Sequence, residues 1–445
     1  MSKDNHIIIT DKNRCSGCAA CMSACPKKCI SMQEDEEGFL YPHVDENTCI
    51  SCSKCVTVCP YTKSEFTNKL EKEELAICYA AYNKNEEIRY QSSSGGMFRA
   101  FSDYIIAEGG VVFGAKFDKD FTVEHAYTET MEGLVDFMGS KYMQSRMGNS
   151  FTTVKSFLDK GRKVLFTGCG CQIAGLKRYL KKDYANLFCI DLICHGVDSP
   201  RIWLDYLHYL MPNETIKQIN FRDKITGQDN SSICIKSCNS LFCEKKKNNI
   251  YFRNWRYGLF VRPSCEICPF KADNRVSDIT IADCWGFQKM APEMYDDNGL
   301  SSVIVHTAKG MAIFEAVQSQ ITYKKSSLDD VKAYNADYIR SSPFNYKKRA
   351  AFWRDYHKQT MPFGKLLKKH LEYSHRQRIA KFIKKSHTQM LGILKKIIKL
   401  TLNLNTIQIK QPQRMIEIDK RFNETFRFGG NKMSHISSGN PNGNL

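Results

Sequence analysis

Apolar residues in the middle of the chain fall in short runs that alternate with longer amphipathic stretches. Short apolar runs bounded by turn residues are typical of strands buried in a sheet. The runs are 110–117, 163–167, 187–194, 276–283 and 302–306. Two longer stretches, 97–108 and 172–180, repeat their apolar residues with the period of a helix. This alternation predicts an α/β domain over residues 71–345, with functional loops at the strand ends.

The pattern changes after residue 345. From 379 to 399 the apolar residues fall on one helical face and the lysines on the other, which predicts a basic amphipathic helix. Such a helix can lie on an anionic membrane surface, or it can pack its apolar face on its own protein. We assign 346–430 to a helical basic C-terminal extension and 431–445, rich in Asn, Gly and Ser, to a disordered tail.

The net charge of +18 is concentrated in this extension. Residues 347–414 hold 18 Lys or Arg residues against Asp355 and Glu372, and the residues before them are close to neutral. We therefore expect the charge to serve a partner or a surface, and we expect no nucleic-acid partner for the rest of the chain.

Length and cysteine usage narrow the class of protein further. The 445 residues exceed one ordinary core, which predicts two or three domains. Residues 1–14 are polar and charged, unlike a secretory signal, so we expect a cytoplasmic protein whose 20 cysteines stay reduced. No run of apolar residues approaches the length of a membrane-spanning helix. The membrane contact left to consider is therefore peripheral association with the inner face of the membrane.

Residues 1–70 contain two copies of the spacing C-x2-C-x2-C-x3-C-P. In bacterial ferredoxins three cysteines of such a run bind one [4Fe-4S] cluster and the fourth binds the other cluster. We therefore predict an α+β ferredoxin domain with two clusters. One cluster takes Cys15, Cys18, Cys21 and Cys59, and the other takes Cys49, Cys52, Cys55 and Cys25.

Zinc is the alternative to iron–sulfur clusters at these cysteines. Zinc sites usually draw on two pairs of ligands, whereas runs of four ending in proline favour clusters. Small residues such as Gly17 and Ala19 allow backbone amides to approach the sulfur atoms. Cys29 lies outside the repeat and is predicted to be a packed core thiol.

Four loops of the middle domain carry further candidate chemistry. A Ser/Gly loop at 92–96 precedes a helix, where it either offers amides to a phosphate or serves as a plain cap. Cysteine-bearing loops follow two strands, at 167–172 and 191–196, and parallel strands would bring them to one edge of the sheet. A C-x2-C pair at 265–268 precedes the strand that leads into 283–286.

These motifs in this order resemble the beta subunits of coenzyme F-420 hydrogenases and dehydrogenases, a family of iron–sulfur flavoproteins. The resemblance covers residues 1 to about 310. The motifs are Ser94-Gly95-Gly96, Gly139-Ser140-Lys141-Tyr142 with Gln144-Ser145, Gly168-x-x-Cys171-Gln172 with Gly175-Leu176, Cys194-His195-Gly196, Phe221-Arg222-Asp223-Lys224, and Cys265-x-x-Cys268 with Asp283-x-Trp285-Gly286.

The resemblance implies that the middle domain binds FAD and a third [4Fe-4S] cluster. The predicted ligands of this cluster are Cys171, Cys194, Cys265 and Cys268. Relatives carry Gly-Thr-Pro-Cys-Gln where this chain has Gly-Cys-Gly-Cys-Gln, so Cys169 competes with Cys171 as a ligand. A lost cluster or a zinc ion is the alternative.

The resemblance also assigns the FAD site. The pyrophosphate is predicted to lie at Ser94, Gly95 and Gly96. The ring and the ribityl chain are predicted to lie near Ser140, Lys141, Tyr142, Gln144 and Ser145. Further residues expected around the cofactor are Gly168, Gln172 and Gly196. Lys141 is expected to stabilise the anionic reduced flavin, and a solvated surface lysine is the alternative.

Three more residues are candidates for contact with a substrate. His195 is expected either to relay a proton or only to hydrogen-bond the backbone. Arg222 and Lys224 are expected to bind an acidic tail of the substrate, the alternative being ordinary surface charge.

Two differences from the family remain. Ala282 and Cys284 replace the usual Gly and Phe before Trp285, which changes the wall of the pocket. Five cysteines match no motif and are predicted to be free thiols, namely Cys78, Cys189, Cys234, Cys238 and Cys243.

The leading function is an oxidoreductase that passes electrons between ferredoxin-type clusters, FAD and a small organic acceptor, deazaflavin-like or other. A redox partner protein or ferredoxin would exchange electrons with the clusters. The alternative is a non-catalytic electron-transfer subunit that connects a separate enzyme, and bound flavin would separate the two.

Overall fold

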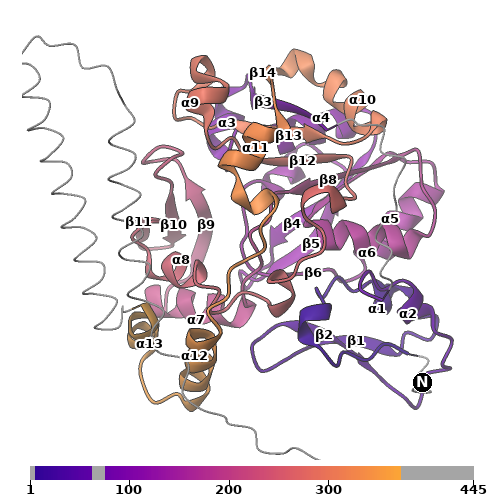
Figure 1. Ribbon diagram of the computed structural model, residues 1–445, viewed down its shortest axis with the longest axis vertical. Helices are drawn as coiled ribbons and strands as arrows, with labels where there is room; N and C mark the ends of the chain where they lie inside the picture. Colours follow the sequence, from indigo (N-terminus) through magenta and orange to yellow (C-terminus); the bar gives the residue numbers. More distant parts are fainter. Residues whose placement is uncertain (1–5, 63–75, 372–445) are drawn as a thin grey trace, which may run out of the picture. The chain divides into compact units, whose positions relative to one another are not determined.

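A computed structural model describes residues 6–62 and 76–371 of the chain (Figure 1). All described residues lie within one of the two units into which the chain divides, the unit that ends at Glu372. The predicted amphipathic helix at 379–399, its membrane contact and the predicted disordered tail lie outside the described residues. Within 6–62 and 76–371, no helix has the length and apolar character needed to cross a membrane.

The N-terminal cysteine-rich segment combines one β-hairpin with short helices, as an α+β ferredoxin domain would. The antiparallel hairpin pairs β1 (Ile30–Glu34) with β2 (Leu40–Val44). The helices are η1 (Lys12–Arg14), α1 (Ala20–Ala24) and α2 (Lys54–Thr57). Ala19 and Ser53, which precede α1 and α2 at equivalent places in the repeat, both take the left-handed conformation, with φ of 59° and 58°. The two halves of the sequence repeat therefore fold alike.

The middle of the chain forms a nine-stranded mixed sheet in the order β14-β3-β13-β12-β8-β7-β4-β5-β6. Its strands are β3 (Ile77–Asn83), β4 (Val111–Phe117), β5 (Val123–Thr128), β6 (Ser145–Arg146), β7 (Val164–Gly168), β8 (Leu187–Leu192), β12 (Ile279–Asp283), β13 (Ser301–Val305) and β14 (Ile321–Ser326). The five predicted strands are all present. The central strands β4, β7, β8 and β12 run parallel, whereas β3, β13 and β14 pair antiparallel at one flank. The α/β prediction is thus met in the centre of the sheet only.

Helices cover both faces of this sheet (Figure 1). On one face, α4 (Met97–Ala107) and α10 (Ala308–Ala316) share a core with Val112 of β4. On the other face, α5 (Ser150–Asp159) and α6 (Gly170–Leu180) share a core with Val111 of the same strand, because successive strand residues point to opposite faces. This second core also contains Cys18 and Ala20 of the ferredoxin segment, which therefore packs directly against α6.

A separate aromatic core joins a small sheet to two helices of the middle domain and two that follow it. The sheet has the order β11-β10-β9, with β9 (Ile216–Asp223), β10 (Ser232–Ser237) and β11 (Leu241–Lys245). The core includes Trp203, Tyr251 and Phe352. Its helices are α7 (Pro200–Leu210), α8 (Ile250–Trp255), α12 (Tyr346–Lys358) and α13 (Phe363–Leu371). The described part of the predicted basic extension is thus helical and packs here.

Short elements complete the described chain. The helices are α3 (Glu86–Gln91), α9 (Phe287–Met290) and α11 (Leu328–Tyr334), and the 3-10 segments are η2 (Glu132–Phe137), η3 (Pro263–Cys265), η4 (Ala272–Asn274), η5 (Pro292–Met294), η6 (Gln318–Gln320) and η7 (Ala336–Tyr338).

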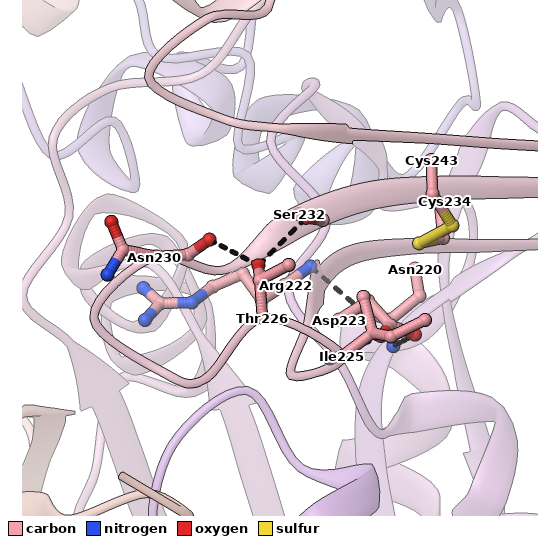
Figure 2. Close-up of a disulfide and its surroundings, with 9 residues drawn as sticks. All are labelled: Asn220, Arg222, Asp223, Ile225, Thr226, Asn230, Ser232, Cys234 and Cys243. Atoms are coloured by element: carbon pink, nitrogen blue, oxygen red, sulfur yellow. Dashed lines mark hydrogen bonds between the residues drawn. A yellow bond between two sulfur atoms is a disulfide. The ribbon is translucent and has the colours of Figure 1, made fainter.

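The prediction that Cys234 and Cys243 are free thiols is wrong. They form a disulfide between β10 and β11, which Figure 2 shows beside the loop that follows Arg222. The two residues lie opposite each other in the antiparallel register, with Cα atoms 4.2 Å apart, a separation that a disulfide can bridge. The sequence alone does not reveal this pairing because it depends on the register of the hairpin. Cys78, Cys189 and Cys238 are free thiols, as predicted.

Candidate functional site

The first cysteine set, defined as Cys15, Cys18, Cys21 and Cys59, is gathered at the contact with α6. Burial, and to a smaller extent the neighbouring Cys59 and Cys15, raises the pKa of Cys18 to about 12. Thiols with such pKa values resist ionisation unless a metal takes their negative charge. Gly175 of α6 faces this set, since a Cβ at that position would lie 2.8 Å from Cys18 Sγ.

The second cysteine set, defined as Cys25, Cys49, Cys52 and Cys55, lines a small cavity made by ferredoxin residues alone. Cys52 is exposed to solvent. Cys29 is buried, but it also lines this cavity, with its Sγ 3.3 Å from Cys25 Sγ. The second set thus has a fifth thiol within reach.

The third cysteine set, defined as Cys171, Cys194, Cys265 and Cys268, lines another small cavity together with Cys169. Because β7 and β8 are parallel, the loops after them bring Cys171 and Cys194 to one edge of the sheet, and η3 delivers Cys265. Cys169 Sγ lies 3.8 Å from Cys194 Sγ, so both candidate cysteines of this loop stay available.

The geometry of these sets fits clusters better than single metal ions. A zinc ion needs four ligand atoms around one point, with Zn–S distances of about 2.3 Å. Within residues 6–62 and 76–371, no three His, Cys, Asp or Glu side chains converge in that way. The thiols of the second and third sets instead line cavities, as the ligands of a cube do. Cations balance a negative cluster, and Arg262, Lys271 and Arg275 all line the third cavity.

A larger cavity of about 690 Å³ opens beside the third set, at the carboxyl ends of β7, β8 and β12. This is the edge where α/β sheets usually bind ligands. It is lined by most residues of the predicted FAD and substrate sites, namely Ser94, Gly96, Ser140, Lys141, Tyr142, Gln144, Ser145, Gly168, Gln172, His195 and Arg222. Cys171 and His195 line this cavity and the third cysteine cavity, so the two share a wall.

The Ser/Gly loop leads into the N-terminus of α4 at this cavity. Gly96 caps the helix with φ of 84°, and Met97 of the first turn lines the cavity. Gly95 does not line it, because its N–H donates to Ser301 Oγ at 2.9 Å and a Cβ there would lie 2.5 Å from Ala81 O. The amides of the first turn of a helix have no partner within the helix and are the groups that bind anions such as phosphate in other proteins.

One wall of the cavity is a closed hydrogen-bond network around His125, which the sequence analysis missed. Ser145 Oγ accepts from Gln172 Nε2 at 2.8 Å and lies 2.8 Å from His125 Nδ1, while His125 Nε2 lies 3.1 Å from Thr167 O. Burial lowers the pKa of His125 to about 4, which keeps the imidazole neutral. These hydrogen bonds therefore hold the side chains of Ser145 and Gln172 in place in the cavity wall.

Lys141 and Tyr142 also line the cavity. Lys141 Nζ donates to the carbonyl oxygens of Asp136 and Met138, both at 2.9 Å, and burial lowers its pKa to about 7. Tyr142 accepts a hydrogen bond of 2.6 Å from Lys246 Nζ, and Lys246 also lines the cavity. Nothing in the local sequence around Lys246 signals this position.

Gln144 lines the cavity, but its side-chain amide reaches toward the ferredoxin segment. Its Oε1 accepts from Leu40 N at 3.2 Å and from Arg262 Nη1 at 2.9 Å. Gly17 makes room for it, since a Cβ there would lie 2.1 Å from Gln144 Nε2. Gln144 thus serves the contact between the two domains.

His195 lies between the two cavities. Its Nδ1 is 2.9 Å from Asp337 Oδ2, and its ring contacts Trp255. Burial alone would raise the pKa of Asp337, but the hydrogen bond from His195 holds that pKa below its ordinary value. Nε2 of His195 is buried and has no hydrogen-bond partner among the described residues. Gly196, beside it, lines the third cysteine cavity and not the larger one.

Arg222 and Lys224, adjacent in the predicted substrate motif, have different surroundings. Arg222 is buried in the cavity wall, where Nη1 donates to Asp283 Oδ2 at 2.5 Å and Nε and Nη2 have no partner in the described part of the chain. Lys224 lies outside the cavity lining, and its Nζ donates to the carbonyl oxygens of Arg89, Ser94 and Asn298. Lys224 therefore anchors the Ser/Gly loop.

Comparisons with known proteins agree with the motifs. Residues 161–331 match the family model for the C terminus of the coenzyme F420 hydrogenase/dehydrogenase beta subunit, and residues 14–63 match the 4Fe-4S dicluster domain. No curated protein matches the chain. A chain of the F420-reducing [NiFe] hydrogenase complex from Methanosarcina barkeri aligns with 17% identity and a TM-score of 0.43, over 60% of this chain and 90% of that chain. The chain therefore contains two segments similar to known families, an N-terminal one that matches the 4Fe-4S dicluster domain and a later one that matches the C terminus of the coenzyme F420 hydrogenase/dehydrogenase beta subunit.

Proposed function

We propose that the protein is an iron–sulfur flavoprotein oxidoreductase that passes electrons between ferredoxin-type clusters, FAD and a small organic acceptor. The observation that carries the proposal is the wall shared by the third cysteine cavity and the cavity of about 690 Å³. A third cluster and a large planar cofactor would lie in adjoining compartments, with Cys171 and His195 between them.

The arrangement of the cysteine sets suggests an order for the electrons. The second set has an exposed cysteine and is the natural entry point for a redox partner protein or ferredoxin. The first set packs on α6, whose first turn carries Cys171 of the third set. Tyr61, two residues after Cys59, lines the third cavity. The route from partner to large cavity would thus run through the second, first and third sets.

The residues of the large cavity fit FAD. The N-terminus of α4 with Ser94 would hold the pyrophosphate, as the sequence predicts. Lys141 would lie near the ring, and its pKa of about 7 suits a side chain that gains a proton when negative charge appears beside it. The uncharged hydrogen-bond network of His125, Ser145 and Gln172 would hold its own part of the cavity wall in place. FAD, when bound, converts single-electron into two-electron transfers.

Two residues are candidates for binding the small organic acceptor. Arg222 keeps two guanidinium nitrogens free inside the cavity wall and would pair with an acidic group of the acceptor. His195, held by Asp337, would present Nε2 to it as a hydrogen-bonding group. Lys224 is engaged by three carbonyl oxygens, so we do not retain it as a substrate ligand.

Anaerobic purification followed by counting of iron, sulfide and flavin tests the proposal. We expect about twelve irons and one FAD per chain. Cys268→Ser should lose about four irons, and Cys238→Ser, an exposed cysteine outside all three sets, should lose none. About eight irons with no flavin would contradict the flavoprotein and leave only an electron-transfer subunit.

A further inference from the structure

Arg262 differs from the other buried arginines in what surrounds its charge. Within the described residues five arginines are buried. Four of them pair with a carboxylate, in the pairs Arg89–Asp296, Arg222–Asp283, Arg275–Asp191 and Arg349–Glu37. Arg262 is fully buried, and the hydrogen-bond partners that the structure gives it are carbonyl oxygens, an amide oxygen and a sulfur. A buried cation without an anion is strongly destabilising.

The partners of Arg262 belong to the first cysteine set and its surroundings. Nε donates to Cys15 O at 2.8 Å, and Nη2 donates to Leu40 O at 3.0 Å and lies 3.7 Å from Cys15 Sγ. The guanidinium also lies over the Tyr41 ring, 4.3 Å from its centroid. The side chain thus reaches from the middle domain into the first turn of the ferredoxin motif.

The main chain of Arg262 belongs to the third cysteine set. Its carbonyl accepts from Cys265 N at 3.0 Å, and the residue lines the third cavity. One side chain therefore lies between two sets of thiols that are predicted to become thiolates on binding clusters. Those thiolates supply the negative charge that the protein side chains around Arg262 do not.

We propose that Arg262 is a positioning residue that stabilises the reduced state of the cluster bound by the first cysteine set. Reduction adds one electron from a donor to the cluster and increases its negative charge, so a buried cation hydrogen-bonded at Cys15 favours the reduced form. The cavity of the second set is lined by Lys27, but this lysine is exposed to solvent, whereas Arg262 is fully buried. Arg262 thus favours passage of the electron inward, from the second set to the first.

This inference rests on the iron–sulfur part of the proposed function and not on the flavin. The experiment is a potentiometric titration of the full-length protein, purified without oxygen and followed by electron paramagnetic resonance. The signal of the first set is the one that Cys21→Ser removes. Because this signal is read directly, protein without flavin, which would contradict the proposed function, still tests the role of Arg262.

Arg262→Gln should lower the ratio of reduced to oxidised first-set cluster about tenfold at a fixed potential, which equals a shift of about 59 mV for one electron. The second-set signal should not move. The matched control is Arg201→Gln, because Arg201 also reaches the ferredoxin hairpin, at Glu36 O and Glu34, but contacts no cysteine. An Arg262→Gln protein that keeps its iron and leaves the first-set ratio within twofold of wild type would overturn the proposal.

The variant Arg262→Lys tests the role of the positive charge separately from any effect of the substitution on folding. Lysine keeps the positive charge and loses the planar fork, so the first-set ratio should stay within about threefold of wild type. If Arg262→Gln protein cannot hold iron, this variant decides the question. A ratio within threefold then supports the role of the charge, and a tenfold fall contradicts it.

Discussion

The first and second cysteine sets come from the same repeated sequence but have different surroundings. Both halves use the same spacing and the same left-handed residue before a short helix. The first set is covered by α6 and Arg262, whereas the second set lines a cavity of ferredoxin residues with Cys52 exposed. A repeat therefore specifies the ligands of a cluster, and the domain that packs on it decides which copy faces inward.

Filling the contact with α6 should have the largest effect. Gly175→Leu places a side chain where a Cβ alone lies 2.8 Å from Cys18 Sγ, and such overpacking costs about 3 kcal/mol. We expect loss of the first cluster, about four irons, with the second-set signal intact. Iron analysis and electron paramagnetic resonance check this. Lys177→Leu, on a half-buried position of the same helix, is the control, and a Gly175→Leu protein with full iron would contradict the contact.

Replacing one ligand in the first set and one in the second should cause unequal losses of iron. In Cys25→Ser, Cys29 is positioned to replace the lost ligand, because its Sγ lies 3.3 Å from Cys25 Sγ. We expect this variant to keep its iron, whereas Cys59→Ser should lose about four irons from the first set. The double variant Cys25→Ser/Cys29→Ser should lose about four as well. Loss of iron in Cys25→Ser alone would show that Cys29 does not act as a spare ligand.

The two sets should also differ in how fast they lose iron. With an exposed cysteine, the second set is open to an iron chelator, while the first set requires local opening of its contact with α6. We expect the second-set signal to decay about tenfold faster than the first in the same anaerobic sample. Equal decay rates would mean that the packing on α6 gives no protection.

The smallest effect should come from Gln144, which ties the inward half to the middle domain. Gln144→Ala removes the acceptor used by Leu40 N and Arg262 Nη1, at a cost of about 1 kcal/mol. Hydrogen exchange of the Leu40 amide should accelerate about fivefold, with both clusters retained. Gln91→Ala, which removes an exposed amide bonded to Glu87 on α3, should leave this exchange unchanged.

Local spacing was enough to predict the first two cysteine sets and the central strands, whereas the third set was predicted from the family resemblance, because its cysteines are spread from residue 171 to residue 268. The antiparallel flank of β3, β13 and β14 could not be predicted in that way, since it joins strands more than 200 residues apart. The disulfide Cys234–Cys243 joins residues only nine apart, but it depends on the register of a hairpin, which the sequence pattern does not fix.

The missed site residues show the same limit. His125, Lys246 and Asp337 belong to no motif and reach the large cavity only through the folded chain. Arg222 and Lys224 belong to one motif but have different roles. Arg222 lines the cavity, whereas Lys224 donates to backbone carbonyl oxygens.

The shared wall at Cys171 and His195 leaves a single layer of side chains between the sulfur-lined compartment and the larger one. A molecule that binds against this wall of the larger compartment would touch side chains that also border the sulfur atoms. If those thiols hold the proposed third cluster, binding would change the spectrum of that cluster, and the spectrum would then serve as an assay for unidentified ligands.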